Sequence, residues 1–130
     1  MEIAKWMSPS PTCVGPDDTL AAAKKLMDAG RFRRLPVVES EKLIGIITER
    51  DLRQHWGYLD ATKVNAAMTP DPLTVTPRDT AENAARLMLQ HKIGGLPVID
   101  NSELVGILST SDLIRALLNV IQAAEHIMDD

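Results

Sequence analysis

The sequence lacks several features that would place it outside the cell, in a membrane or on nucleic acid. It has one cysteine, Cys13, so it has no internal disulfide framework and fits a reducing cytosol. No apolar run approaches the roughly 20 residues that span a bilayer, and the first residues do not resemble a signal peptide. Its net charge of −4 shows no excess of basic residues, which general nucleic-acid binding usually requires. We therefore expect a cytoplasmic protein with neither membrane nor nucleic acid among its partners.

Sequence motifs of catalysis are also missing. There is no Gly-x-x-x-x-Gly-Lys-Ser loop, no Gly-x-Ser-x-Gly turn and no metal-binding carboxylate cluster. The three histidines, His55, His91 and His126, share no metal-ligand spacing. Cys13 has no histidine or second cysteine near it in sequence, and we interpret it as a strand residue and not a nucleophile. We expect no enzymatic activity, no metal site and no required cofactor.

What the sequence does contain is aliphatic side chains in a repeated order. Aromatic residues make up 3% of the chain and apolar residues 45%, so the core must be built from Leu, Ile, Val, Met and Ala. Sliding the sequence by 61 residues aligns 7–52 with 68–113 without a gap, and 18 of these 46 positions are identical. An internal repeat of this kind predicts two halves that share one fold.

The expected elements follow from hydrophobic periodicity and from the positions of proline and glycine. Gly30 suits a left-handed helix cap, and Pro36 must lie at the edge or start of its strand. The last helix carries a long apolar stripe, which we expect to pack on the sister half or on another subunit. In order, we expect a helical turn at 3–7, an extended segment at 12–14, helices at 20–29 and 49–56, strands at 35–38 and 43–47, a helix at 81–91, strands at 96–99 and 104–108, and a helix at 110–128.

The two copies of one turn, 45–51 and 106–112, are candidate binding elements. Each is an apolar strand that ends in Thr or Ser, with Asp three residues later: Thr48 and Asp51, then Ser109 and Asp112. A strand entering a helix N-terminus presents free N–H groups that can hold a polar ligand. The same residues also form a helix capping box with Asp in place of Glu, and this alternative needs no ligand.

The whole pattern resembles a tandem pair of CBS domains, called a Bateman module. The resemblance is carried by Met-(Ser/Thr)-Pro, Val-x-Pro-x-Asp-Thr, Leu-Pro-Val-(Val/Ile) and Gly-Ile-(Ile/Leu)-(Thr/Ser)-x-x-Asp, each present twice in the same order. It implies an α/β (α+β) fold of two β-α-β-β-α units, packed through their sheets with pseudo-twofold symmetry. The first motif would occupy residues 1–60 and the second residues 61–130.

The resemblance also implies two clefts that bind adenosine nucleotides such as AMP, ADP or ATP, or S-adenosylmethionine. In the main cleft, Asp112 and Ser109 would hold the ribose, and basic residues of the opposite half would reach phosphate. Apolar contacts to the base would come from residues that flank these positions. The full expected set for this cleft is Phe32, Arg33, Arg34, Arg50, Leu73, Thr74, Ile107, Ser109, Ser111 and Asp112.

The second cleft departs from the phosphate-binding pattern. Thr48 and Asp51 would face Gly94, Gly95 and Ser111, which carry no charge. We expect this cleft to be weaker, empty or specific for an uncharged ligand. For the basic residues of the main cleft, an alternative remains that 31–34 is a solvated basic run with no ligand.

The function implied is a regulatory module that senses an adenosine-containing small molecule and acts on a partner protein or a fused domain. Homodimerisation is common among modules of this family and is expected here. The alternative is an interaction module that holds subunits together without any ligand.

Overall fold

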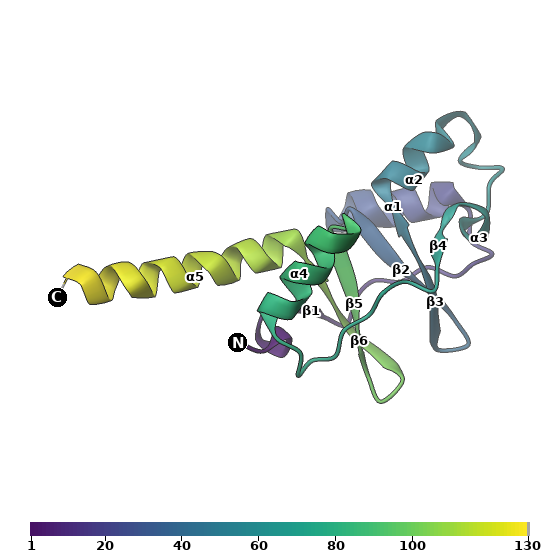
Figure 1. Ribbon diagram of the computed structural model, residues 1–130. Helices are drawn as coiled ribbons and strands as arrows, with labels where there is room; N and C mark the ends of the chain where they lie inside the picture. Colours follow the sequence, from purple (N-terminus) through teal and green to yellow (C-terminus); the bar gives the residue numbers. More distant parts are fainter. Residues whose placement is uncertain (130) are drawn as a thin grey trace. The chain divides into compact units, whose positions relative to one another are not determined.

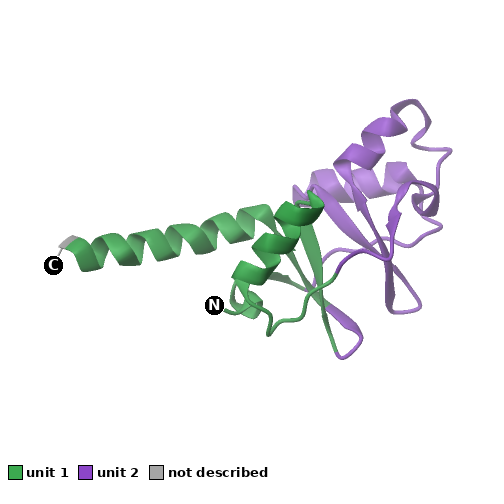
Figure 2. Ribbon diagram, in the orientation of Figure 1, with its two compact units in different colours: residues 1–9, 74–100, 105–130 green, residues 10–73, 101–104 purple. Residues whose placement is uncertain are grey.

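The computed structural model describes residues 1–129, which divide into two compact units (Figure 2). Unit 1 consists of Met1–Pro9, Thr74–Asp100 and Val105–Asp130, and unit 2 of Ser10–Leu73 and Asn101–Leu104. Among the described residues, no helix has the length and apolar character needed to cross a bilayer.

Unit 2 is a three-stranded antiparallel sheet with helices (Figure 1). Its strand order is β2-β3-β4, with β2 and β3 joined by a two-residue turn. The strands are β2 (Arg34–Glu39), β3 (Lys42–Thr48) and β4 (Thr69–Pro70), and the helices are α1 (Leu20–Gly30), α2 (Glu49–Gln54), the 3-10 turn η2 (Trp56–Tyr58) and α3 (Val64–Ala67).

Unit 1 repeats this arrangement with the order β1-β6-β5. Its strands are β1 (Ser8–Pro9), β5 (Gly95–Asp100) and β6 (Glu103–Ser109), and its helices are the 3-10 turn η1 (Ile3–Lys5), α4 (Ala81–His91) and α5 (Thr110–Asp129). The expected mixed fold of two similar units is confirmed, and α4 has the bounds that its periodicity predicts.

The first residues of each motif complete the sheet of the unit that holds most of the other motif. β1 lies near the start of the first motif but pairs with β6 of the second, where Ser8 lies opposite Ile107. β4 begins the second motif but pairs with β3, where Thr69 lies opposite Ile46. The compact units therefore divide the chain differently from the sequence motifs at 1–60 and 61–130.

Each unit has its own aliphatic core, and the exchanged segments contribute to it. Ile3, from the start of the chain, is fully buried among residues of the second motif, and Val64 is fully buried among residues of the first. Both cores follow the predicted strand and helix faces. Unit 2 buries Val14, Leu20, Ala23, Met27, Leu35, Val37, Ile47, Leu52 and Val64, and unit 1 buries Ile3, Val75, Ala84, Met88, Leu96, Val98 and Leu108.

The extended segment expected at 12–14 is a single bridge and not a strand. Val14 donates its N–H to Pro36 O at 3.0 Å and accepts from Val38 N at 2.8 Å. Pro36 has no N–H to offer, and it lies, as expected, on an edge strand. Cys13 thus precedes a one-residue bridge, which corrects its expected place in a strand.

The left-handed cap of α1 is Arg31 and not Gly30, so that prediction was wrong. Arg31 has φ 56° and ψ 40°, and its N–H donates to Met27 O, whereas Gly30 is the last helical residue. Gly30 is needed for space instead: a Cβ there would lie 2.1 Å from Cε2 of the Phe32 ring. The glycine accommodates the aromatic ring that lies against it.

The predicted apolar stripes are only partly covered. On α1, Leu20, Ala23 and Met27 are buried, but Leu26 is 37% exposed. On α5, which extends beyond the other elements of its own unit in Figure 1, Leu117 is 56% exposed. Within the described chain, the C-terminal turns of α5 therefore present an uncovered apolar face.

Gly45 and Gly106 occupy positions where another strand passes close to the backbone. A Cβ on Gly106 would lie 2.9 Å from Ser8 O and 2.7 Å from Met7 Sδ, and a Cβ on Gly45 would meet Thr69 O and Met68 Sδ at 2.9 and 2.5 Å. The thioether could move, but the carbonyl belongs to a paired strand. These contacts explain why Gly and Met recur together in the repeat.

We expect Gly106→Ala to lower the free energy of unfolding by about 1–3 kcal/mol, the usual cost of overpacking. Urea denaturation measures this loss. Gly57→Ala is the matched control, because a Cβ there meets nothing within 4 Å; it should change stability by no more than about 0.5 kcal/mol. Adding Met7→Ala should not rescue Gly106→Ala, since the Ser8 carbonyl remains. Equal denaturation midpoints for the two glycine variants would contradict this account.

Candidate functional site

The first copy of the repeated turn lies where β3 ends and α2 begins. Thr48 has extended backbone angles, and its Oγ1 accepts the N–H of Asp51 at 3.3 Å. In return, Asp51 Oδ2 accepts the N–H of Thr48 at 2.8 Å and the hydroxyl of Thr48 at 3.0 Å. The capping box expected from the sequence is therefore complete.

The second copy has the same geometry at the junction of β6 and α5. Asp112 Oδ2 accepts the N–H of Ser109 at 2.7 Å and the hydroxyl of Ser109 at 3.0 Å, and Ser109 Oγ accepts the N–H of Asp112 at 3.3 Å. Asp112 is only 2% exposed, whereas Asp51 is half-buried. Capping thus accounts for one oxygen of each carboxylate and leaves the other, Oδ1, for a different partner.

The two Oδ1 atoms differ in their partners. Asp112 Oδ1 accepts a hydrogen bond from the guanidinium of Arg115, one helical turn further along α5. At the equivalent position after Asp51 stands Gln54, and no residue of the described chain donates to Asp51 Oδ1. Sequence analysis missed Arg115, although its spacing of three residues from Asp112 and its mismatch with Gln54 were available signals.

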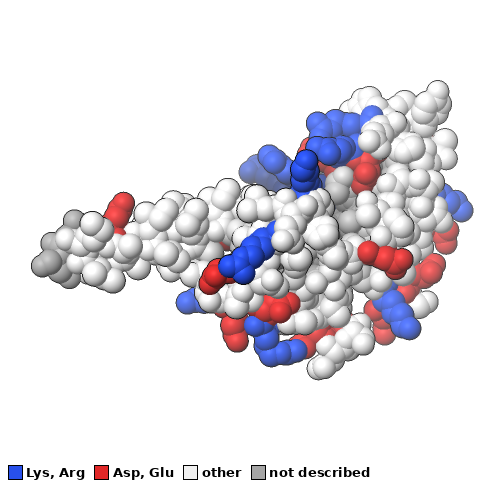
Figure 3. Space-filling view, viewed as in Figure 1, with Lys and Arg blue, Asp and Glu red and all other residues white. Residues whose placement is uncertain are grey.

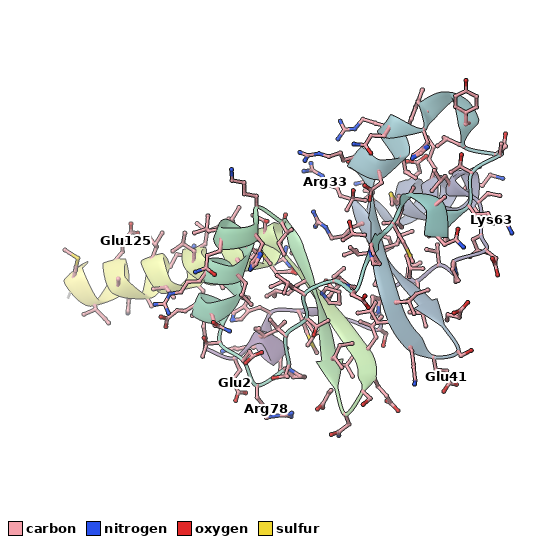
Figure 4. The ribbon with its side chains drawn as sticks, turned by 45° about the vertical axis from the view of Figure 1, so that its right-hand side comes forward. Glu2, Arg33, Glu41, Lys63, Arg78 and Glu125 are labelled. Atoms are coloured by element: carbon pink, nitrogen blue, oxygen red, sulfur yellow. The ribbon has the colours of Figure 1, made fainter. Side chains whose placement is uncertain are left out.

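Three expected phosphate contacts lie beside the first turn. Arg34 opens β2 and pairs with Thr48, and the N–H of Glu49 donates to Arg33 O at 2.9 Å. Arg50 follows in the first turn of α2. The sheet register and the start of α2 thus bring Arg33, Arg34 and Arg50 together on one part of unit 2, and Figure 4 labels Arg33 at its edge.

These arginines have no acidic partners. Within residues 1–129, all three arginines of unit 1 form ion pairs with Asp or Glu, at Arg78, Arg86 and Arg115. None of the five arginines of unit 2 does so; these are Arg31, Arg33, Arg34, Arg50 and Arg53. Figure 3 shows the resulting gathering of basic side chains beside α2.

Burial and like charge both act on Arg34. Its partial burial lowers the pKa of its guanidinium, and the neighbouring positive charge of Arg33 lowers that pKa further. Both effects mean that the charged form of Arg34 is less well stabilised than in water. An opposite charge bound here would stabilise the charged form of Arg34 against both effects, so this part of unit 2 is electrostatically suited to an anion such as phosphate.

The residues equivalent to the arginines carry no charge. Gly94 O accepts from both the N–H and the hydroxyl of Thr110, at 3.0 and 3.2 Å, and Gly95 is buried at the start of β5. Ser111 is exposed in the first turn of α5. The structure therefore places Gly94, Gly95 and Ser111 together in unit 1, where they supply no basic side chain.

The expected base contacts are distributed over both units. Phe32 and Leu73, in unit 2, are 42% and 41% exposed. Ile107, in unit 1, is half-buried in β6, and Thr74 is exposed. That these four side chains and the ribose and phosphate residues contact one ligand stays a prediction.

Other reactive groups do not form a second site. The Cys13 thiol donates to Pro11 O at 3.3 Å, and burial raises its pKa, which disfavours the reactive thiolate. The described part of the chain holds no group of three His, Cys, Asp or Glu side chains arranged to bind a metal.

Comparison with known proteins identifies relatives of both sequence and structure. The sequence profile of the family described as CBS domain matches residues 2–57 and 63–119. A CBS domain-containing protein of Dictyostelium discoideum is 34% identical over 135 residues, covering 92% of this chain and 93% of that protein. The crystal structure of CBSX2 in complex with AMP, a protein known from Arabidopsis thaliana, is 30% identical with a TM-score of 0.82, covering 92% of this chain and 97% of that one.

The chain also resembles part of an enzyme. It is 37% identical to inosine-5'-monophosphate dehydrogenase of Korarchaeum cryptofilum over 101 residues, which cover 77% of this chain. That match spans only 21% of the length of the dehydrogenase. The similarity therefore concerns a short segment of the enzyme and transfers no activity to this chain.

Proposed function

Because the chain belongs to the CBS domain family, we propose that it is a regulatory module that binds an adenosine nucleotide. Its role would be sensing and not catalysis. AMP, ADP and ATP are the ligands we expect first, with S-adenosylmethionine as a further adenosine-containing candidate. The AMP complex of CBSX2 supports this class of ligand.

The observation that carries the proposal is the charge imbalance between the units. All arginines of unit 1 are paired with acids, while Arg33, Arg34 and Arg50 of unit 2 are unpaired and adjacent within the described chain. Like charges at short range raise the free energy of a folded protein unless solvent or an anion compensates them. A phosphate group is a suitable compensating anion, because its oxygens match the fork of N–H donors on a guanidinium group.

In this proposal Asp112 holds the ribose, as the resemblance implies, and the three arginines contact phosphate of the same ligand. A carboxylate is an acceptor-only group that suits two ribose hydroxyls. Asp51 would serve a second, weaker site with Gly94, Gly95 and Ser111, suited to an uncharged ligand. The ligand would regulate a partner protein or fused domain through its different affinities for two arrangements of the module.

One observation favours the alternative, a ligand-independent interaction module. The apolar side chains on the C-terminal half of α5 are uncovered, with Ile127 74% exposed and Val120 46% exposed. Exposed apolar patches mark interaction sites. We include homodimerisation in the proposal, and the two functions differ in whether a nucleotide binds.

Calorimetric titration of the full chain with AMP, ADP, ATP and S-adenosylmethionine separates the two functions. We expect at least one phosphate-bearing nucleotide to bind with a Kd below about 1 mM. Asp112→Asn should weaken that binding at least about tenfold, because an amide accepts fewer hydroxyl hydrogen bonds than a carboxylate. Unchanged circular dichroism would show that the cap and fold persist. If no nucleotide binds below about 1 mM, while sedimentation shows a stable dimer, the alternative is favoured.

A further inference from the structure

Both oxygens of the carboxylate that is expected to hold ribose already accept hydrogen bonds within their own unit. Asp112 Oδ2 accepts two hydrogen bonds from Ser109, and Oδ1 accepts one from Arg115. Asp112 is 2% exposed, whereas the Arg115 side chain is 58% exposed. The carboxylate is therefore fixed by its surroundings, and the guanidinium is the partner that is free to turn into solvent.

The repeat supplies an internal comparison for this contact. Both aspartates form the same three hydrogen bonds with their Thr or Ser, two accepted by Oδ2 and one donated by the Asp N–H. Corresponding distances differ by at most 0.1 Å, as in 2.8 Å against 2.7 Å for the backbone N–H bond to Oδ2. They differ in the residue three positions later, which is Gln54 in the first copy and Arg115 in the second. Only the second copy therefore has a cation on Oδ1 in the described chain.

We propose that Arg115 is a specificity-determining residue that restricts access of ribose to the Asp112 carboxylate. This inference rests on the proposed function. Because Oδ2 already accepts two hydrogen bonds, a ribose that binds through both of its hydroxyls needs both acceptor positions of Oδ1. It must therefore displace the guanidinium, which exchanges a hydrogen bond between two charged groups for one from a neutral hydroxyl. Bonds with one or both partners charged are stronger than neutral ones, and a charged donor is the better partner for a carboxylate.

The two turns consequently differ in the ligand class that they accept. At Asp112, a nucleoside alone gains too little to displace Arg115, whereas a nucleotide has phosphate contacts that offset the loss. At Asp51, Oδ1 is open and the surrounding residues of the proposed site are uncharged, so an uncharged nucleoside binds there first. Arg115 thus makes the Asp112 site selective for phosphate-bearing ligands over nucleosides.

The test exchanges the two residues between the copies. Adenosine and AMP are titrated into the full chain, and wild type is compared with Arg115→Gln and Gln54→Arg. NMR identifies the occupied turn by following the backbone amides of Thr48, Asp51, Ser109 and Asp112. Arg86→Gln is the control, because Arg86 pairs with Glu82 at 4.0 Å on the exposed surface of α4. It should leave both affinities unchanged.

We expect Arg115→Gln to tighten adenosine binding at the Ser109–Asp112 turn about three- to tenfold, and AMP binding less. Gln54→Arg should weaken adenosine binding at the Thr48–Asp51 turn by a similar factor. Unchanged or weaker adenosine and AMP binding in Arg115→Gln would overturn the inference while leaving the proposed function standing, since Arg115 would then orient Asp112 for ribose. If neither ligand perturbs either turn in any variant, the proposed function fails and this inference fails with it.

Discussion

Truncating Ile3 to alanine is expected to lower the free energy of unfolding by about 2–5 kcal/mol, the usual cost of emptying a fully buried site. The loss should fall on unit 1, which contains most of the second motif, although Ile3 itself lies at the start of the first motif. Ile3 is 0% exposed and packs with the core of that unit. Its N–H donates to Asp79 O at 2.9 Å, which fixes the segment against the turn before α4.

Native-state hydrogen exchange can locate the loss, because it reports opening free energies residue by residue. We expect faster exchange in β5, β6 and α4, with β2 and β3 changed less. Val64→Ala is the matched variant, since Val64 occupies the equivalent place in unit 2 and should produce the opposite pattern. Lys5→Ala, at an exposed position of η1, should leave both units unchanged. Destabilisation confined to β2 and β3 by Ile3→Ala would contradict the exchanged arrangement.

This exchange shows where the sequence is informative and where it is not. Local periodicity predicts α4 with correct bounds and both hairpins to within about one residue at each end, because those elements follow from neighbouring residues. It does not reveal that β1 pairs with β6, some 98 residues later, because two strand residues carry no pattern of their own. Only the repeat offers a hint, in that β1 and β4 occupy equivalent positions.

Backbone conformation is repeated more faithfully than residue identity. Among residues 1–129, eight non-glycine residues have positive φ, and they form four pairs separated by 61 positions, none of them identical in residue type. Sequence reasoning assigns left-handed positions to glycine, so it selected Gly30 and missed its neighbour. The pairs are Ser10 with Asp71, Arg31 with Lys92, Ser40 with Asn101, and Glu41 with Ser102.

For the candidate site, the sequence predicts which residues cap each turn, and the structure confirms both capping boxes in full hydrogen-bond detail. The sequence could not predict that Asp112 Oδ1 pairs with Arg115, because a helical spacing of three residues permits an ion pair without requiring one. The predicted roles of Arg33, Arg34 and Arg50 remain proposals, and removing their charge tests them directly.

The double variant Arg33→Ala, Arg50→Ala is expected to weaken AMP, ADP or ATP binding about 10- to 100-fold, because each lost contact is a hydrogen bond to a charged group. Binding of adenosine should change less than about twofold, since adenosine has no phosphate to lose. Calorimetry with both ligands gives the two losses. The Arg78→Ala variant is the control, because Arg78 is a cation of unit 1 that already pairs with Asp100 at 3.1 Å.

Stability distinguishes a binding role from a structural one. Arg33 and Arg50 are exposed and have no ion-pair partner in the described chain, so their removal should not lower the free energy of unfolding of the free protein. Removing Arg33 should even relieve Arg34, whose pKa is lowered by burial and by the charge of Arg33. The variant should therefore be as stable as wild type without ligand and less stabilised than wild type by ATP, since a ligand stabilises only by binding the folded state. Equal losses of adenosine and ATP affinity would show that these arginines shape the site and do not contact phosphate.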